Sequence, residues 1–300
     1  MTKIGLLGDV HGDKEWIKFA LWKFARESIT NVLQVGDFGI GSDSHSESFL
    51  KIANEYAKAA GIFLRIIPGN HENWELINRL FERGEHYFND GWATLRSNIL
   101  VAPRGLRWEW DGVTFVALGG APSVDRGWRR RADAGHPNAK NKLWYSGEMI
   151  TLEDVYNTVQ GGYADVMLAH DAPRGVPTVD KAIYGNPHGF ERADILYAND
   201  GRDLMDQAFR GVGPRTFIHG HYHRYGSDMV RRPNWPPSDL DGERDLWTHV
   251  LGLDMNGRTR SLGHYDTEEK EAYAWDTRND LALYRTGRDT WAGTGVLDDA

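Results

Sequence analysis

The sequence predicts an α/β fold whose first strands run parallel. In the first seventy residues, a short apolar run rich in β-forming residues meets a glycine-containing turn three times, and an amphipathic helical stretch follows each turn. Successive βα units of this kind are typical of an open α/β sheet, in which ligands bind at the carboxyl ends of the strands. Polar residues of one chemical kind stand at each of these strand ends, which supports the same arrangement.

The individual elements of this first part follow from apolar spacing and from turn or capping residues. Apolar residues recur every three to four positions in the helical stretches, and the strands are short and rich in Ile, Leu and Val. In chain order the pattern predicts a strand at Lys3–Leu7, a helix capped by Asp13, a strand at Asn31–Val35, a helix around Glu47–Ala60 that Gly61 ends, a strand at Ile62–Ile67 and a helix near Glu75–Arg83.

The second part of the chain begins with an antiparallel pattern. Within Ala93–Ala121, the dipeptide Asp111-Gly112 predicts a hairpin between strands Leu106–Trp110 and Val113–Leu118. Later elements are a helix at Thr151–Val159 with a capping-box pattern, strands at Ala164–Ala169 and Arg215–Ile218, a loop at Arg231–Asp245 and a last sheet strand at Trp247–Leu253.

Charge is concentrated in two segments. Residues 122–143, expected to be a loop, carry six basic side chains against two acidic ones, whereas residues 264–300 carry nine acidic against four basic ones. We expect the basic segment to be an insertion that acts as a lid over a site. We expect the acidic segment to be a peripheral C-terminal extension of a main domain at 1–263.

Composition narrows the possible functions. The chain has 300 residues, 40% of them hydrophobic, and a formal net charge of −8, which argues against non-specific binding to nucleic acid through Lys and Arg. It contains no cysteine, so any metal must be held by nitrogen and oxygen ligands. It shows neither a signal peptide nor an apolar run long enough to span a membrane, and we expect a soluble, cytoplasmic protein.

Five strand ends supply side chains that are typical metal ligands. They are Asp9 and His11, Asp37, Asn70 and His71, His170, and His221 with His223. Imidazole and carboxylate groups bind divalent ions such as Mn²⁺, Fe²⁺, Zn²⁺ and Ni²⁺, and two such ions can share one carboxylate. The spacing of two within Asp9/His11 and within His221/His223 places both members of a pair on one side of an extended segment. The number of ligands fits two ions.

The order of these groups resembles the signature of the calcineurin-like metallophosphoesterase family. The five blocks are Gly8-Asp9-Val10-His11, Gly36-Asp37, Gly69-Asn70-His71-Glu72, a strand-terminal His170 and Gly220-His221-Tyr222-His223. The resemblance covers roughly residues 3–253. It implies a four-layer α/β/β/α sandwich of two mixed β-sheets flanked by helices.

The resemblance also implies roles for single residues. One metal would be held by Asp9, His11 and His223, the other by Asn70, His170 and His221, and Asp37 would bridge the two. His71 would stay off the metals and act as the general acid, or stabilise charge on the phosphoryl group. The two ions, with Mn expected and Fe, Zn or Ni as alternatives, would supply a bridging hydroxide that attacks phosphorus in line.

The substrate is less closely specified. After Asp37 the sequence continues Phe38-Gly39-Ile40-Gly41 and not Asp-Arg-Gly, which is typical of the family's Ser/Thr phosphatases, so protein phosphatase activity is not expected. We expect a small phosphodiester or phosphomonoester, with a nucleotide or cyclic nucleotide favoured. A nuclease acting on short or single-stranded nucleic acid, and a non-catalytic protein on the same fold, are the alternatives. The sequence leaves the oligomeric state open.

Residues for substrate contact come from the basic segment and from the aromatic side chains. Arg126 and Arg130 are candidates for gripping a phosphate, although a solvated surface explains such a cluster equally well. Trp74 and Trp128 are candidates for stacking on a base, although most tryptophans belong to cores. His219 could support the metal ligands, and His188 could line the cleft, but both are also consistent with ordinary structural or surface residues.

Overall fold

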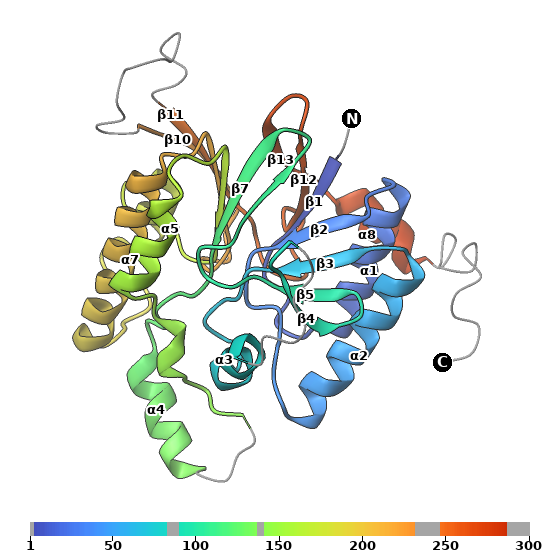
Figure 1. The fold of residues 1–300 in the computed structure, drawn as a ribbon. Helices are drawn as coiled ribbons and strands as arrows, with labels where there is room; N and C mark the ends of the chain where they lie inside the picture. The colour runs from blue at the N-terminus through green and yellow to red at the C-terminus, as the bar shows by residue number, and fades with distance from the viewer. Residues whose placement is uncertain (1–2, 83–89, 137–140, 232–246, 287–300) are drawn as a thin grey trace.

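The computed structural model describes residues 3–82, 90–136, 141–231 and 247–286. Within these residues the chain forms two β-sheets (Figure 1). The first sheet has the strand order β13 (Glu271–Ala274), β12 (Leu262–Asp266), β1 (Lys3–Leu7), β2 (Asn31–Gln34), β3 (Phe63–Ile66), β5 (Ile99–Val101) and β4 (Ala93–Arg96). The second has the order β10 (Gly226–Arg231), β11 (Trp247–Gly252), β9 (Thr216–His219), β8 (Val166–Ala169), β7 (Val113–Leu118) and β6 (Arg107–Trp110).

Both sheets are mixed. Strands β1, β2, β3 and β5 pair in parallel, while β12, β13 and β4 join that sheet in antiparallel pairs. In the second sheet β7, β8, β9 and β11 pair in parallel, with β6 and β10 antiparallel at its edges. Parallel strands place their carboxyl ends at the same edge, so the loops that follow them are brought together.

Helices cover the outer face of each sheet. The first sheet packs against α1 (Lys14–Arg26), α2 (Ser44–Ala59), α3 (Trp74–Glu82) and α8 (Arg278–Arg285), and the second packs against α5 (Leu152–Gln160), α6 (Pro177–Ile183) and α7 (Arg192–Val212). Among the described residues, no helix is both long and apolar enough to cross a membrane.

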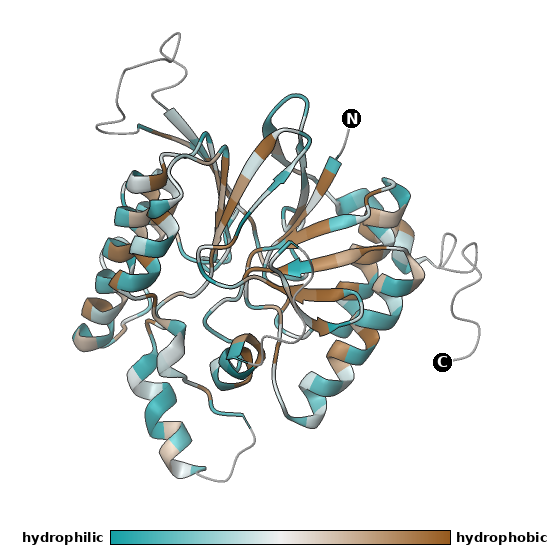
Figure 2. Cartoon of the chain, in the orientation of Figure 1, coloured by the Kyte–Doolittle hydropathy of each residue, from teal (hydrophilic) through white to brown (hydrophobic). Residues whose placement is uncertain are grey.

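A third apolar cluster lies between the sheets. Leu33 and Val35 of the first sheet's β2 segment face Phe115, Leu168 and other residues of the second sheet. Val32, whose side chain points the other way, belongs to the helix-covered outer cluster. Strands buried on both faces explain the continuous apolar runs in the sequence, which Figure 2 shows as brown strands inside mixed-polarity helices. The predicted four-layer α/β/β/α sandwich is confirmed.

Local signals in the sequence were interpreted correctly at several points. Asp13 caps α1 by accepting hydrogen bonds from the backbone N–H groups of Glu15 and Trp16. Thr151 and Asp154 form the expected capping box of α5. Asp111 and Gly112 both have positive φ, 50° and 72°, as the tight turn between β6 and β7 requires.

The basic segment 122–143 is not only a loop, as the sequence suggested. It contains α4 (Arg126–Gly135), which packs against α7. Asp194 of α7 accepts a hydrogen bond from the Gly127 N–H at 2.9 Å and forms an ion pair with Arg126, and Glu191 pairs with Arg131. These contacts come from a distant part of the chain, so the local pattern gave no signal for the helix. Residues 137–140 of this segment lie outside the described residues.

Three further elements between residues 177 and 231 were not predicted. They are α6, the long helix α7 and the edge strand β10. Within α7, Asp194 and Arg202 are buried together with Met205 and Phe209, so polar residues interrupt its apolar face. Most of the predicted loop at Arg231–Asp245 lies outside the described residues.

The C-terminal part of the chain corrects the prediction of a peripheral extension that starts at residue 264. The strand Trp247–Leu253 is present as β11 but is not the last one, because β12 and β13 follow it. Residues Leu262–Asp266 pair antiparallel with all five residues of β1, and Tyr265 is 1% exposed. The expected boundary between 263 and 264 therefore falls inside a strand of the first sheet, and residues up to 274 belong to that sheet.

Candidate metal centre

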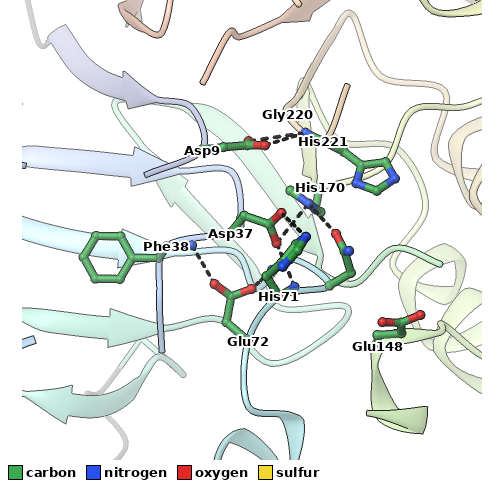
Figure 3. A network of polar contacts seen from close by, with 12 residues as sticks. Asp9, Asp37, Phe38, His71, Glu72, Glu148, His170, Gly220 and His221 are labelled. Carbon is green, nitrogen blue, oxygen red and sulfur yellow. Dashed lines mark hydrogen bonds and ion pairs between the residues drawn. The ribbon is translucent and has the colours of Figure 1, made fainter. Parts of the chain in front are cut away.

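The residues predicted to form a site all follow strand ends, and the structure gathers them where these ends meet. Figure 3 shows Asp9, Asp37, His71, His170 and His221 of this set. Loops after β1, β2 and β3 carry Asp9 and His11, Asp37, and Asn70 and His71, while His170 follows β8 and His221 and His223 follow β9.

These side chains form two clusters that share one carboxylate. In the first cluster, Asp9, His11, Asp37 and His223 each offer one ligand atom, and these atoms all lie within 4.8 Å of one another. In the second cluster the same holds for Asp37, His170 and His221. Asn70 adjoins the second cluster, because its Oδ1 lies 3.0 Å from Nε2 of His170. Such groups of imidazoles and carboxylates are suited to divalent metal ions.

The backbone is strained at four of these positions. His11, Asp37, His221 and His223 have φ values of 51°, 52°, 68° and 49°, in the left-handed region that residues with a Cβ rarely adopt. Each such conformation costs on the order of 1–3 kcal/mol and persists where the surrounding structure imposes it. His11, His221 and His223 therefore lie in turns, and the prediction that each pair shares one side of an extended segment is wrong.

Two glycines are needed because the side chains pack so closely. A Cβ on Gly69 would lie 2.3 Å from Oδ1 of Asp37, and one on Gly220 would lie 2.1 Å from Oδ1 of Asp9. These two glycines are therefore required for the close approach of the loops. Gly36 and Gly39, in contrast, have φ values of 101° and 115°, which their turns require.

A hydrogen bond from Nδ1, the ring nitrogen that points away from the cluster, fixes the orientation of one histidine in each cluster. Nδ1–H of His170 donates to the carbonyl oxygen of Val35 at 2.7 Å, which leaves Nε2 for the site. Nδ1–H of His11 donates to Oδ1 of Asn256 at 3.1 Å, and the amide of Asn256 donates in turn to Asp13 at 3.0 Å. Such partners are typical of metal-binding histidines, because they set the tautomer that presents a lone pair.

The electrostatics of the clusters are dominated by the buried Asp37. Burial opposes charge on His170 and on His11, but the interactions of both with Asp37 and Asp9 outweigh it and raise the pKa of His170 to about 10 and that of His11 to about 9. Burial alone would raise the pKa of Asp37, yet its histidine partners hold that pKa well below its usual range. Without metal, protons on imidazoles thus balance the carboxylates, and a divalent cation would replace them.

Comparison with known proteins identifies the family. A sequence model of calcineurin-like phosphoesterases matches residues 2–225, about three quarters of the chain. The chain belongs to the calcineurin-like phosphoesterase family. A comparison with curated proteins gave no match. Among solved structures, a Thermus thermophilus protein named TT1561 is 13% identical with a TM-score of 0.48, and the match covers 92% of this chain and 100% of that one. A dimetal phosphatase from Danio rerio is 12% identical with a TM-score of 0.42, and the match covers 88% and 91%.

Glu72, which directly follows His71, is a buried carboxyl group that accepts hydrogen bonds from backbone N–H groups and belongs to neither cluster. Its Oε1 accepts from the Phe38 N–H at 2.6 Å and its Oε2 from the Gly69 N–H at 2.6 Å, so it ties the loop that bears Asp37 to the loop that bears Asn70 (Figure 3). Burial and the charge of Asp37 raise the pKa of Glu72 to about 7.

His71 contacts an arginine that the sequence analysis did not select. Its backbone N–H donates to Oδ1 of Asp37 at 2.8 Å, while its ring nitrogens Nδ1 and Nε2 lie 3.0 and 2.8 Å from Nη1 and Nη2 of Arg129. Burial lowers the pKa of His71, and the charge of Arg129 adds to this effect against the pull of Asp37. No sequence signal separates this arginine from its neighbours, because the packing of α4 on α7 decides which of them faces His71.

A second missed group supports Asn70. Its Nδ2–H donates to Oγ of Ser123 at 2.9 Å, and the Ser123 hydroxyl donates to Oε2 of Glu148 at 2.7 Å. Glu148 also accepts from Trp144 and Tyr197 and is fully buried. Because Nδ2 of Asn70 is engaged, its Oδ1 is the atom directed toward His170 and the site.

The two arginines predicted to grip a phosphate contact other parts of the protein. Arg126 lies over the ring of Tyr197 at 3.9 Å and pairs with Asp194 at 3.6 Å. Arg130 lies over the ring of Trp144 at 5.3 Å. In place of these two, the structure brings Arg129 to His71.

The other candidates occupy different surroundings. Trp74 is only 2% exposed, donates to the Gly69 carbonyl at 2.9 Å and is covered by the guanidinium of Arg104, so little of its ring is free for a base. Trp128 is 57% exposed on α4. His219 is buried beside Tyr222, and burial lowers its pKa to about 4. His188 is exposed and contacts Phe190 between α6 and α7.

Proposed function

We propose that this calcineurin-like phosphoesterase is a dinuclear-metal-dependent hydrolase of a small phosphate ester, either a phosphodiester or a phosphomonoester. The observation that carries the proposal is the position of Asp37, which is 1% exposed and belongs to both clusters. A carboxylate shared by two ligand groups is the arrangement that two ions about 3.5–4 Å apart require.

The residues present fit a pair of divalent ions. Asp9, His11 and His223 would hold one ion, Asn70, His170 and His221 the other, and Asp37 both. Burial and the neighbouring histidines lower the pKa of His221 well below its ordinary value, so this imidazole keeps a lone pair for a metal. Imidazole, amide and carboxylate donors without thiolate are compatible with Mn²⁺, Fe²⁺, Zn²⁺ and Ni²⁺, and we propose Mn²⁺ with the other three as alternatives. When bound, such ions supply a water ionised near neutral pH and polarise the phosphoryl oxygens.

His71 and Arg129 would act on the substrate directly. His71 is bound through its backbone to Asp37, while 38% of its side chain is exposed, so it can donate a proton or a hydrogen bond to the leaving oxygen. Arg129 is held by Asp125 at 2.6 Å and by the Leu143 carbonyl at 3.1 Å. A neutral imidazole has one lone pair and a protonated one has none, so at most one of the two contacts of Arg129 with His71 is a hydrogen bond. An oxyanion between the two residues would satisfy both.

The contacts of the basic helix favour a small substrate over a long nucleic acid. Three arginines of α4, namely Arg126, Arg129 and Arg131, already form ion pairs with Asp194, Asp125 and Glu191. Binding to a nucleic-acid backbone depends on the charge that remains for phosphates. We therefore propose a nucleotide or cyclic nucleotide, and keep a nuclease as the second candidate.

Metal analysis and a substrate panel test this function. The purified protein loaded with Mn²⁺ should hold two ions per chain by elemental mass spectrometry and hydrolyse bis-p-nitrophenyl phosphate, p-nitrophenyl phosphate or nucleotides. His71→Ala should keep both ions but lower kcat by about 10²–10⁴-fold, most strongly for poor leaving groups. His188→Ala, at an exposed histidine away from the clusters, is the matched control. One ion per chain, a loaded protein inactive on the whole panel, or metal loss in His71→Ala would contradict the proposal.

A further inference from the structure

A cavity of about 280 Å³ lies between α3, α4 and the segment that leads to Glu148. Its lining includes Trp74, Asn78, Arg130, Trp144, Tyr145 and Ser146. Ligand pockets measure roughly 300–1,000 Å³, so this one accommodates a single ring system and not an extended polymer.

The walls of the cavity are joined to the residues that would meet the substrate. Trp74 donates its indole N–H to the carbonyl of Gly69, the residue before Asn70. Arg130 directly follows Arg129, whose guanidinium contacts His71. Trp144 donates to Glu148, which holds Ser123 and through it Asn70. Contacts therefore link the walls of the cavity to Gly69 and Asn70, which lie in the loop that carries His71.

The charges in the cavity are mostly compensated. Lys142 forms an ion pair with Glu75, and the carboxylate of Asp133 accepts from the backbone N–H groups of Leu143 and Trp144 at 2.7 and 3.0 Å. Among the described residues, no carboxylate pairs with Arg130, whose guanidinium lies over the Trp144 ring at 5.3 Å. The result is a planar guanidinium on an indole, which attracts a further electron-rich ring.

Two polar side chains in the cavity can form hydrogen bonds with the edge of an aromatic ring that stacks on Arg130. Within the parts of the chain that the structure describes, the Asn78 amide and the Ser146 hydroxyl form no hydrogen bond with other protein groups. Each can both donate and accept. A nucleobase combines a stacking face with an edge of donors and acceptors, whereas a sugar lacks the face and a phenyl ring lacks the edge.

We infer that this cavity binds the heteroaromatic base of a nucleotide substrate while its phosphate lies at the metal centre. The inference deepens the proposed function and rests on it. Arg130 is then the residue that stacks on the base, and Asn78 and Ser146 contact its edge. Arg130 then determines the selectivity for the base, whereas Arg129 contacts the phosphoryl group.

The test compares ligands that differ only in the base. Adenosine 5′-monophosphate and ribose 5-phosphate share the phosphate and the 5′-oxygen, so the cavity should matter for the first alone. In the Mn²⁺-loaded protein, Arg130→Gln should lower kcat/KM for adenosine 5′-monophosphate about tenfold and leave that for ribose 5-phosphate unchanged. Arg131→Gln, one residue further on α4 and paired with Glu191, should change neither. If adenine does not fit the cavity, the same comparison is made with the guanosine, cytidine and uridine 5′-monophosphates, whose bases present different hydrogen-bonding edges.

Calorimetric binding separates this inference from the proposed function. Tighter binding of one nucleotide than of ribose 5-phosphate, lost in Arg130→Gln, supports the cavity even if no ester is hydrolysed, in which case only the proposed function fails. Hydrolysis with equal kcat/KM and equal affinity for all four nucleotides and ribose 5-phosphate overturns the cavity while the phosphoesterase function stands. An equal loss for both ligand types in Arg130→Gln also overturns it.

Discussion

The two ligand clusters of the centre differ in exposure and in what holds them. In the second cluster His170 is fully buried and His221 is half-buried, and Asn70 beside them is 3% exposed. In the first cluster Asp9 is fully buried, but 26% of the His11 side chain and 40% of the His223 side chain are exposed. The second cluster is fixed by the Val35 carbonyl and by the Ser123–Glu148 pair. The first depends on Asn256, which follows the residues that the family model matches.

This difference indicates that the two clusters would hold metal unequally. A buried, hydrogen-bonded ligand set loses little conformational freedom when an ion binds and is shielded from competing water. The more open first cluster would release its ion more easily. Asp37 belongs to both clusters, so a substitution at this residue should weaken the binding of both ions alike.

The largest effect is expected at that shared carboxylate. Asp37→Asn should abolish stoichiometric binding of both ions, because it removes the charge that each cluster uses, and hydrolysis should fall with it. Elemental analysis after gel filtration in Mn²⁺-containing buffer gives the occupancy. A variant that still carries two ions per chain would show that the clusters do not share this residue. Asp203→Asn, which alters an exposed carboxylate of α7 outside both clusters, serves as the control.

Glu148 supports the second cluster, and we expect its ionisation to change the free energy of unfolding by about 3 kcal/mol. Burial raises the pKa of Glu148 to about 7, above the ordinary 4.5, so the folded state binds its proton more tightly than the unfolded state. The resulting stabilisation is complete below pH 4.5 and is lost as the pH rises through 7. Between pH 4 and 8, the unfolding free energy of the wild type minus that of Glu148→Gln should therefore fall by about 3 kcal/mol.

Denaturant unfolding at several pH values, with a chelator present to remove metal effects, measures this difference. Subtracting the variant cancels the contribution of the cluster histidines, which titrate in both proteins. Glu153→Gln on α5 is exposed and should give a flat difference. A flat difference for Glu148→Gln as well would mean that this carboxyl group is ionised throughout, held by its four hydrogen bonds.

A smaller effect is expected at Asn256, which supports the first cluster. Asn256→Ala removes the acceptor that orients His11 and should weaken binding of one of the two ions by about tenfold, while the other ion keeps its affinity. A Mn²⁺ titration with a competing chelator resolves the two affinities. Arg258→Gln, in the same turn, should leave both unchanged. Equal weakening of both ions would show that Asn256 stabilises the loops in general.

The features that could be predicted share a local origin. Asp9, His11, Asp37 and the other ligands stand at strand ends, so the alternation of apolar runs and glycine turns placed them at one sheet edge before any contact was known. Capping by Asp13 and the Asp111-Gly112 turn depend on residues within four positions. The β12–β13 hairpin was missed because its partner is β1, more than 250 residues earlier, and the acidic composition of 264–300 concealed its apolar positions.

The sequence alone therefore determined the chemical kind of the candidate site, its order along the chain and the start of the sheet, because apolar runs, helical spacing and glycine turns are local properties of the chain. Only the tertiary structure decided that Arg129 and not Arg126 or Arg130 reaches His71, since neighbours on a helix point about 100° apart and the packing of α4 on α7 fixes which one faces the centre. It also decided the roles of Glu148 and Asn256. Their contacts join segments far apart in the chain, and such contacts arise from packing, of which the local pattern carries no trace.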